Sequence, residues 1–215
     1  MPLTTSAADF LPTRLNLKAL RDAAKHCKGC DLYKNATQTV FGEGPRGAHM
    51  ILLGEMPGDQ EDREGKPFVG PAGRLLDESR EEAEIPRDAV YVTNAVKHFR
   101  WEPRGKRRLH NKPTARQIEA CRPWLQAEIL VIKPEVVVRL GATAAQTMLG
   151  RDFRLTKHRG ELFPGDGVDW VTATYHPSAI LRAPEKADRD RMRAEFVEDL
   201  QHAAKRFTIA VSRTR

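Results

Sequence analysis

The sequence predicts an α/β fold of three layers, in which helices cover both faces of a central, mostly parallel, four-stranded sheet. Along the 215 residues, short strands that are apolar throughout alternate with segments of helical periodicity. This alternation is typical of a parallel sheet that is buried on both faces. The length suits one domain with its own core. We therefore expect a single domain over residues 1–215, with residues 1–13 as a loose lead-in.

The predicted elements follow in a regular order. A first helix has apolar side chains at helical spacing over residues 15–24 and continues to Cys27. Another helix begins near Pro71, a residue favoured in the first turn, and a long one begins at Thr114, which forms a capping box with Gln117. A short helix follows Gly141, and the last helix covers roughly 188–206. The strands are expected at residues 50–53, 90–93, 136–138 and 170–174.

The carboxyl ends of parallel strands meet at one edge of the sheet, and binding sites of such folds lie there. We therefore expect the loops after Leu53, Thr93, Leu140 and Thr174 to converge on a site.

The charge of the chain fits a nucleic-acid partner. Lys and Arg total 36 against 29 acids, a net charge of +7, although many basic proteins bind no nucleic acid. Residues 97–116 contain eight basic side chains and one acid, and Trp101 and His110 lie within this run. A solvated loop would explain the charges alone, whereas the interleaved aromatic residues favour a phosphate-binding loop.

No apolar run reaches the roughly 20 residues of a membrane span, and the first residues lack the pattern of a signal peptide. We expect a cytoplasmic monomer that does not contact membranes. The three cysteines are an odd number, and a disulfide framework is not expected in a reducing compartment.

Three motifs lie in the converging loops. Residues 54–62 read GEMPGDQED and 65–76 read GKPFVGPAGRLL, residues 91–97 read YVTNAVK, and residues 174–178 read TYHPS. Together they resemble the uracil-DNA glycosylase superfamily, in its iron–sulfur (family 4) branch, over roughly residues 25–205. The run KRRLH at residues 106–110 is most similar to the UdgX type, which cross-links to uracil-containing DNA.

The resemblance implies excision of uracil. The Asn94 side chain has a carbonyl and an amide that match N3–H and O4 of uracil, and Phe68 would stack on the flipped base. Gly54, Met56 and Asp59 would complete the uracil pocket. The residues alone allow plainer roles, a turn for Asn94 and core packing for Phe68.

Cleavage of the glycosidic bond leaves positive charge on the sugar and negative charge on the base. The resemblance assigns stabilisation of the uracil anion at O2 to His176. Glu55 would stabilise the sugar cation or accept a proton. DNA contacts are expected from the side chains of Lys106, Arg107, Arg108 and Ser178.

In the UdgX type, the histidine that His110 matches attacks C1′ of the sugar and forms a covalent adduct. We therefore expect a glycosylase that traps its own product and prefers single-stranded DNA, from which a flipped base is cheapest to present. Two alternatives are an iron–sulfur glycosylase that releases abasic DNA, with His110 contacting only phosphate, and a non-catalytic module that binds uracil-containing DNA.

The cysteines predict a metal site. Cys27-x-x-Cys30 has the spacing of metal ligands or of a redox pair. The family's iron–sulfur enzymes use four cysteines, and His98 stands where their third one follows the Asn94 motif. The resemblance thus implies a [4Fe-4S] cluster on Cys27, Cys30, His98 and Cys121, which would tie the first helix to the basic loop. A zinc site on the same residues is the alternative.

Met56 departs from the family pattern, because relatives carry Ala or, in the UdgX type, Gln at this position. A thioether is only a weak acceptor and cannot replace an amide side chain. The backbone N–H of Met56 can still face uracil, so the departure bears on rate or specificity.

Overall fold

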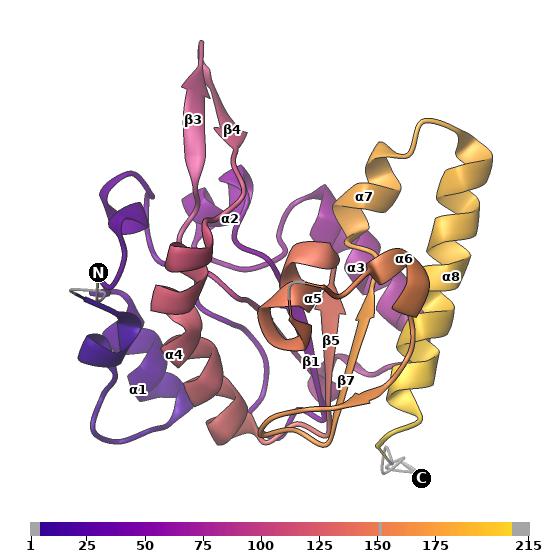
Figure 1. Ribbon diagram of the computed structural model, residues 1–215, viewed down its shortest axis with the longest axis horizontal. Coiled ribbons are helices and arrows are strands. Elements are labelled where there is room, and N and C mark those ends of the chain that lie inside the picture. The colour runs from indigo at the N-terminus through magenta and orange to yellow at the C-terminus, as the bar shows by residue number, and fades with distance from the viewer. Residues whose placement is uncertain (1–4, 151, 208–215) are drawn as a thin grey trace, which may run out of the picture.

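The computed structural model describes residues 5–150 and 152–207 (Figure 1). Its central sheet has the strand order β2-β1-β5-β7-β6. The four predicted strands are parallel, as expected. A fifth strand, β6, joins them and runs antiparallel to β7; it has only two residues, too few for any periodicity. The strands of the sheet are β1 Met50–Gly54, β2 Val90–Asn94, β5 Val136–Leu140, β6 Phe163–Pro164 and β7 Trp170–Thr174.

The helices also include elements that the sequence pattern did not predict. The α-helices are α1 Leu17–Ala24, α2 Asp59–Glu64, α3 Pro71–Glu82, α4 Ala115–Ile132, α5 Ala142–Leu149, α6 Leu155–His158, α7 Pro177–Arg182 and α8 Lys186–Ala204; the 3-10 helices are η1 Ala7–Phe10, η2 Asp31–Lys34 and η3 Arg87–Ala89. Within the segment expected to be a loose lead-in, η1 is capped by Ser6, and its Ala7 is buried. The predicted capping box of Thr114 and Gln117 is confirmed at the start of α4.

Both faces of the sheet are covered, which confirms the three layers. On one face, side chains of α3, α7 and α8 pack against alternate residues of β1, β2 and β5. On the other face, α4 packs against the residues between them, and α1 lies on the outer side of α4 (Figure 1). A separate core joins η1, α1 and α4 and contains the cysteines. None of the described helices is long and apolar enough to cross a membrane.

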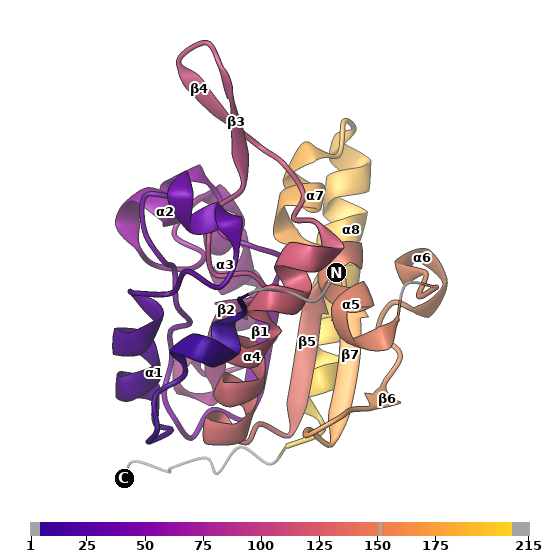
Figure 2. The same ribbon diagram turned by 60° about the vertical axis from the view of Figure 1, so that its left-hand side comes forward.

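The basic segment predicted as a loop is a β-hairpin that projects from the body (Figures 1 and 2). Its strands are β3 Trp101–Arg104 and β4 Arg107–His110, paired antiparallel with Trp101 opposite His110. Two residues connect them, and the first, Gly105, has a φ of 60°, as type II′ hairpin turns require. Pro103 and the dense charges conceal the alternation that would otherwise indicate strands.

Candidate active site

Gly54 ends β1 beside Asn94, the last residue of β2. A Cβ atom on Gly54 would lie 2.2 Å from Asn94 Oδ1 and 2.8 Å from Phe68 Cζ. Only glycine therefore leaves room for the amide and the ring to approach the strand end together. Asn94 is nearly inaccessible, with 4% of the residue exposed. The predicted convergence is thus confirmed for the loops that follow Leu53 and Thr93.

Phe68 is held in place by an unusual backbone. Its φ of 56° lies in the left-handed region, which non-glycine residues seldom adopt. A Cβ atom on Gly73 in α3 would lie 1.6 Å from the Phe68 carbonyl oxygen, so the loop lies directly on the helix. The Phe68 ring stacks beside that of His176, with 6.2 Å between ring centroids and 29° between planes.

His176 is fixed in one orientation at the start of α7. Its Nδ1 accepts a hydrogen bond from the Ser178 backbone N–H at 3.1 Å and lies 2.7 Å from Ser178 Oγ. Burial lowers the pKa of His176 to about 4, and the nearby Arg182 and His110 add to this shift. The ring is therefore neutral at pH 7, and its proton lies on Nε2, where it can be donated to a ligand.

Glu55 and His110 interact electrostatically at this edge of the sheet. Partial desolvation lowers the pKa of His110, and the Glu55 carboxylate counteracts this shift. Glu55 Oε1 is buried and accepts no hydrogen bond within the described part of the chain. A buried oxygen of this kind is costly unless a ligand or a proton donor satisfies it. The arrangement thus provides a carboxylate acceptor, a neutral imidazole at His176 and a second imidazole at the base of the hairpin.

The basic residues of the hairpin have two different surroundings. Lys106 and Arg107 are exposed at its tip, as a contact with phosphate requires. Arg108, also predicted to contact DNA, turns inward and leaves only 13% of its side chain exposed. It forms ion pairs with Asp59 and Asp62. Its guanidinium lies 5.4 Å from the ring centroids of both Phe99 and Trp101. Arg108 therefore fastens the hairpin to the body of the protein.

Two other predicted pocket residues have side chains that are engaged within the protein. Asp59, at the start of α2, binds Arg63 and Arg108 with its carboxylate. The Met56 side chain is buried in the core that contains the cysteines.

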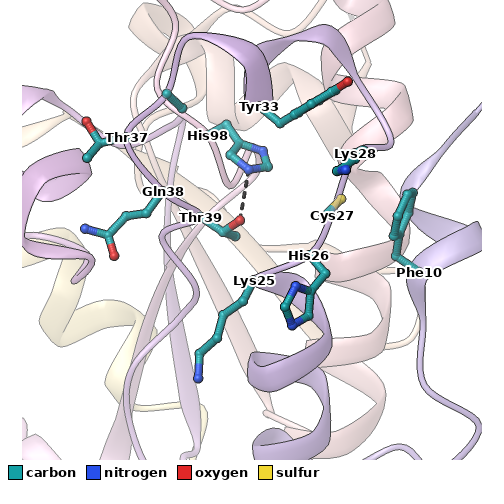
Figure 3. A pocket seen from close by; sticks show the side chains of 11 residues that line it. Phe10, Lys25, His26, Cys27, Lys28, Tyr33, Thr37, Gln38, Thr39 and His98 are labelled. Atoms are coloured by element: carbon teal, nitrogen blue, oxygen red, sulfur yellow. Dashed lines mark hydrogen bonds between the residues drawn. The ribbon is translucent and has the colours of Figure 1, made fainter.

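The four predicted cluster ligands lie in one region. Cys27 and Cys121 belong to the core of η1, α1 and α4, and Cys30 packs against it. Burial raises the pKa of the Cys121 thiol to about 12, and the nearby Cys30 and Cys27 thiols contribute. Burial lowers the pKa of His98 to about 4, which leaves the neutral imidazole that metals bind. Cys27 and His98 both line a cavity of about 370 Å³, in which His98 Nε2 lies 2.9 Å from Thr39 Oγ1 (Figure 3).

A single ion needs ligands that converge on one point, and no group of three or more His, Cys, Asp or Glu side chains in the described residues could hold one. This holds for the cluster ligands and for the zinc alternative alike, because both were predicted on the same four residues.

One buried group of residues escaped prediction. Lys97 was counted among the phosphate-binding residues of the basic run, but its side chain is fully buried and paired with Glu128 of α4. The signal that could have revealed this pair is the position of Glu128, three residues after Leu125 on the apolar face of α4. A carboxylate at such a position requires a buried partner.

Comparisons with known proteins identify relatives of this chain. A family model described as "Uracil DNA glycosylase superfamily" matches residues 41–201. The type-4 uracil-DNA glycosylase of Thermotoga maritima is 37% identical over 188 residues, which cover 87% of this chain and 92% of that protein. The type-4 enzyme of Pyrobaculum aerophilum is 34% identical over 86% of this chain and 92% of its own length. A type-5 uracil-DNA glycosylase of the same organism is 32% identical over 64% of each chain. The chain therefore belongs to the uracil DNA glycosylase superfamily.

Proposed function

We propose that this protein removes uracil from DNA by hydrolysing the bond between the base and the sugar. The observation that carries the proposal is the approach of Asn94, Phe68 and His176 to one strand end at Gly54. The relatives are named type-4 and type-5 uracil-DNA glycosylases. These names support turnover, with abasic DNA as the product.

The roles of the side chains follow from their chemistry. A flipped uracil stacks on Phe68, and Asn94 pairs with its N3–H and O4. Cytosine presents the reversed pattern and would leave buried polar groups unpaired. The backbone N–H of Met56 faces the base, and the absent side chain at Gly54 lets the base approach the strand end.

Bond cleavage divides charge between base and sugar. As the C1′–N1 bond breaks, its electron pair moves onto uracil, and His176 Nε2–H stabilises the negative charge at O2. The Glu55 carboxylate stabilises the cationic sugar and takes a proton from the water that attacks C1′. That proton is passed to the uracil anion, so the products are uracil and an abasic site.

The strand itself is held outside the pocket. Lys106 and Arg107 contact phosphates from the hairpin, and Ser178 contacts one at the start of α7. Single-stranded DNA is the preferred substrate, because its bases need not be unpaired before they enter the pocket.

A [4Fe-4S] cluster fits the cysteine region, with Cys27, Cys30, His98 and Cys121 as its ligands. The cluster would supply structural cross-linking between α1, α4 and the segment before the hairpin. Purified protein should then be brown, with broad visible absorption, and Cys121→Ala should remove both the absorption and part of the thermal stability. Colourless wild-type protein would contradict the assignment.

Incubation with a uracil-containing single-stranded oligonucleotide, followed by alkaline cleavage at abasic sites, tests the main proposal. The wild type should yield cleaved DNA, and Asn94→Ala should reduce the rate about 100-fold. The exposed Asn35→Ala should behave as the wild type. Intact uracil after incubation with the wild type would favour a module that binds uracil without excising it.

Covalent trapping through His110 is a second candidate, and the electrostatic interaction of His110 with Glu55 and His176 favours it. In this reaction a ring nitrogen of His110 attacks C1′ in place of water. The C1′–N1 bond breaks, a bond from the imidazole nitrogen to C1′ forms, and Glu55 passes the imidazole proton to the departing uracil. The names of the relatives give this step no support.

A denaturing gel separates turnover from trapping. A band of protein joined to DNA, present in the wild type and absent in His110→Gly, would establish trapping. Abasic DNA with no such band would establish turnover and leave His110 as a residue that contacts the strand.

A further inference from the structure

Lys97 presents a fully buried ammonium group directly behind the recognition residue. Its Nζ lies 2.5 Å from Glu128 Oε2, 2.6 Å from Thr93 Oγ1 and 2.8 Å from the Asn94 carbonyl oxygen. An ammonium has three N–H donors, and each of them has an acceptor here. The Lys97 and Glu128 side chains are both 0% exposed.

Glu128 ties this group to α4 and to β2. Its Oε1 accepts hydrogen bonds from the Tyr91 hydroxyl and the Thr93 hydroxyl, both at 3.0 Å. Tyr91 and Thr93 lie on β2, the strand that ends at Asn94. The buried carboxylate thus joins the end of this strand to the helix that covers it.

The backbone after Asn94 is held throughout its length. Ala95 N–H donates to Gly54 O at 2.9 Å, and Val96 N–H donates to Glu55 O at 3.0 Å. Lys97 N–H donates to Cys121 Sγ at 3.3 Å. The Lys97 ammonium also donates a hydrogen bond to the carbonyl oxygen of Asn94, three residues earlier in the chain. Among these contacts, the Lys97 ammonium is the one that binds the backbone of Asn94 itself from the buried side.

A buried ion pair is seldom retained for stability alone, because apolar side chains of similar volume often stabilise a core as well or better. We propose that Lys97 and Glu128 are positioning residues for the reading of uracil, acting through Asn94. The inference rests on the proposed function, since it assigns these residues to the same site.

The test separates positioning from stability. Lys97→Met leaves the Glu128 carboxylate unpaired and should lower the thermal midpoint, whereas Lys97→Met with Glu128→Gln removes both charges and should recover most of it. If the pair positions Asn94, kcat/KM for uracil excision in this double variant stays about 10- to 100-fold below wild type, as expected for misplaced groups. Binding of uracil-free DNA should be unchanged. Arg139→Leu, which removes a buried cation from β5, should leave kcat/KM unchanged.

The decisive comparison uses Asn94→Ala as the background, under single-turnover conditions. A pair that acts through Asn94 causes no further loss there. Two results would overturn the inference: the same fold-loss of excision rate in both backgrounds, or full activity in the stable double variant. In either case, excision of uracil by the wild type would leave the proposed function standing. A wild type that excises no uracil would overturn both. If the double variant does not fold, Glu128→Gln alone is compared in the two backgrounds, with the same outcomes.

Discussion

Arg108 Nη1 lies 2.7 Å from Asp62 Oδ2, and this contact joins an otherwise exposed hairpin to a fully buried carboxylate. Both Asp62 oxygens also accept a hydrogen bond from the Thr37 backbone N–H, at 3.0 and 3.1 Å. The position of His110, two residues after Arg108, thus depends on the Asp62 carboxylate on the buried face of α2.

Removal of Arg108 should therefore be costly. Arg108→Gln leaves Asp62 buried without its cation, and we expect the free energy of unfolding to fall by about 3 kcal/mol in urea titrations. Arg107→Gln, an exposed change on the same strand, is the control and should have little effect. Adding Asp62→Asn to Arg108→Gln should recover part of the loss; no recovery would mean that the charge pair is not the cause.

The exposed residues of the hairpin should govern the salt dependence of DNA binding. For each of Lys106→Gln and Arg107→Gln, we expect the slope of log Kd against log salt concentration to fall by about 1, which corresponds to one fewer released ion. The loss of affinity should be similar for all DNA sequences. Lys186→Gln on α8 is the control. Unchanged slopes in the hairpin variants would mean that these side chains do not contact the DNA phosphates.

Gly54 should tolerate no side chain. In Gly54→Ala, the new methyl group would occupy the space of Asn94 Oδ1 and Phe68 Cζ, and a displacement of about 1 Å at such a site costs on the order of 100-fold in rate. Gly47→Ala is the matched control, because no heavy atom lies within 4 Å of its new Cβ. Equal excision rates for the two variants would contradict the proposed pocket.

His176 should make the folded state sensitive to acid. Its pKa is about 4 in the folded protein, against 6.5 for an ordinary histidine. Between these values the unfolded chain binds a proton that the folded protein does not, so stability is complete above pH 6.5 and declines toward pH 4. The loss amounts to at most roughly 3 kcal/mol. In His176→Asn, which keeps an acceptor at the start of α7, unfolding followed from pH 7 to pH 4 should show a smaller decline. An equal decline would assign the pH dependence to other groups.

Arg139 is a buried cation without an acidic partner in the described residues. Its Nη1 donates only to Ala145 O, at 3.3 Å, and its Nε is unpaired. Burial lowers its pKa to about 9. Arg139→Leu should therefore stabilise the protein by about 1–3 kcal/mol, the usual cost of an unsatisfied buried group. A lower thermal midpoint would show that the side chain packs better than its polar groups suggest.

The sequence was informative where local rules and topology coincide. Apolar strands followed by glycine and asparagine predicted that Gly54, Asn94 and His176 would meet, because parallel strands leave little freedom at their ends. The sequence was uninformative where a charged side chain pairs with a residue far away in the chain. Lys97 and Arg108 look like members of one basic run, and only tertiary contacts with Glu128 and Asp62 distinguish them from Lys106 and Arg107.

The two-residue turn of the hairpin has a consequence for how such proteins can diverge. Inserting two residues into each strand at the tip would lengthen the hairpin by about 7 Å. Side chains alternate with a period of two, so Arg108 and His110 would keep their orientation. The reach of the hairpin along a nucleic acid can thus be adjusted in discrete steps, without any change to the sheet or to the site where bases are read.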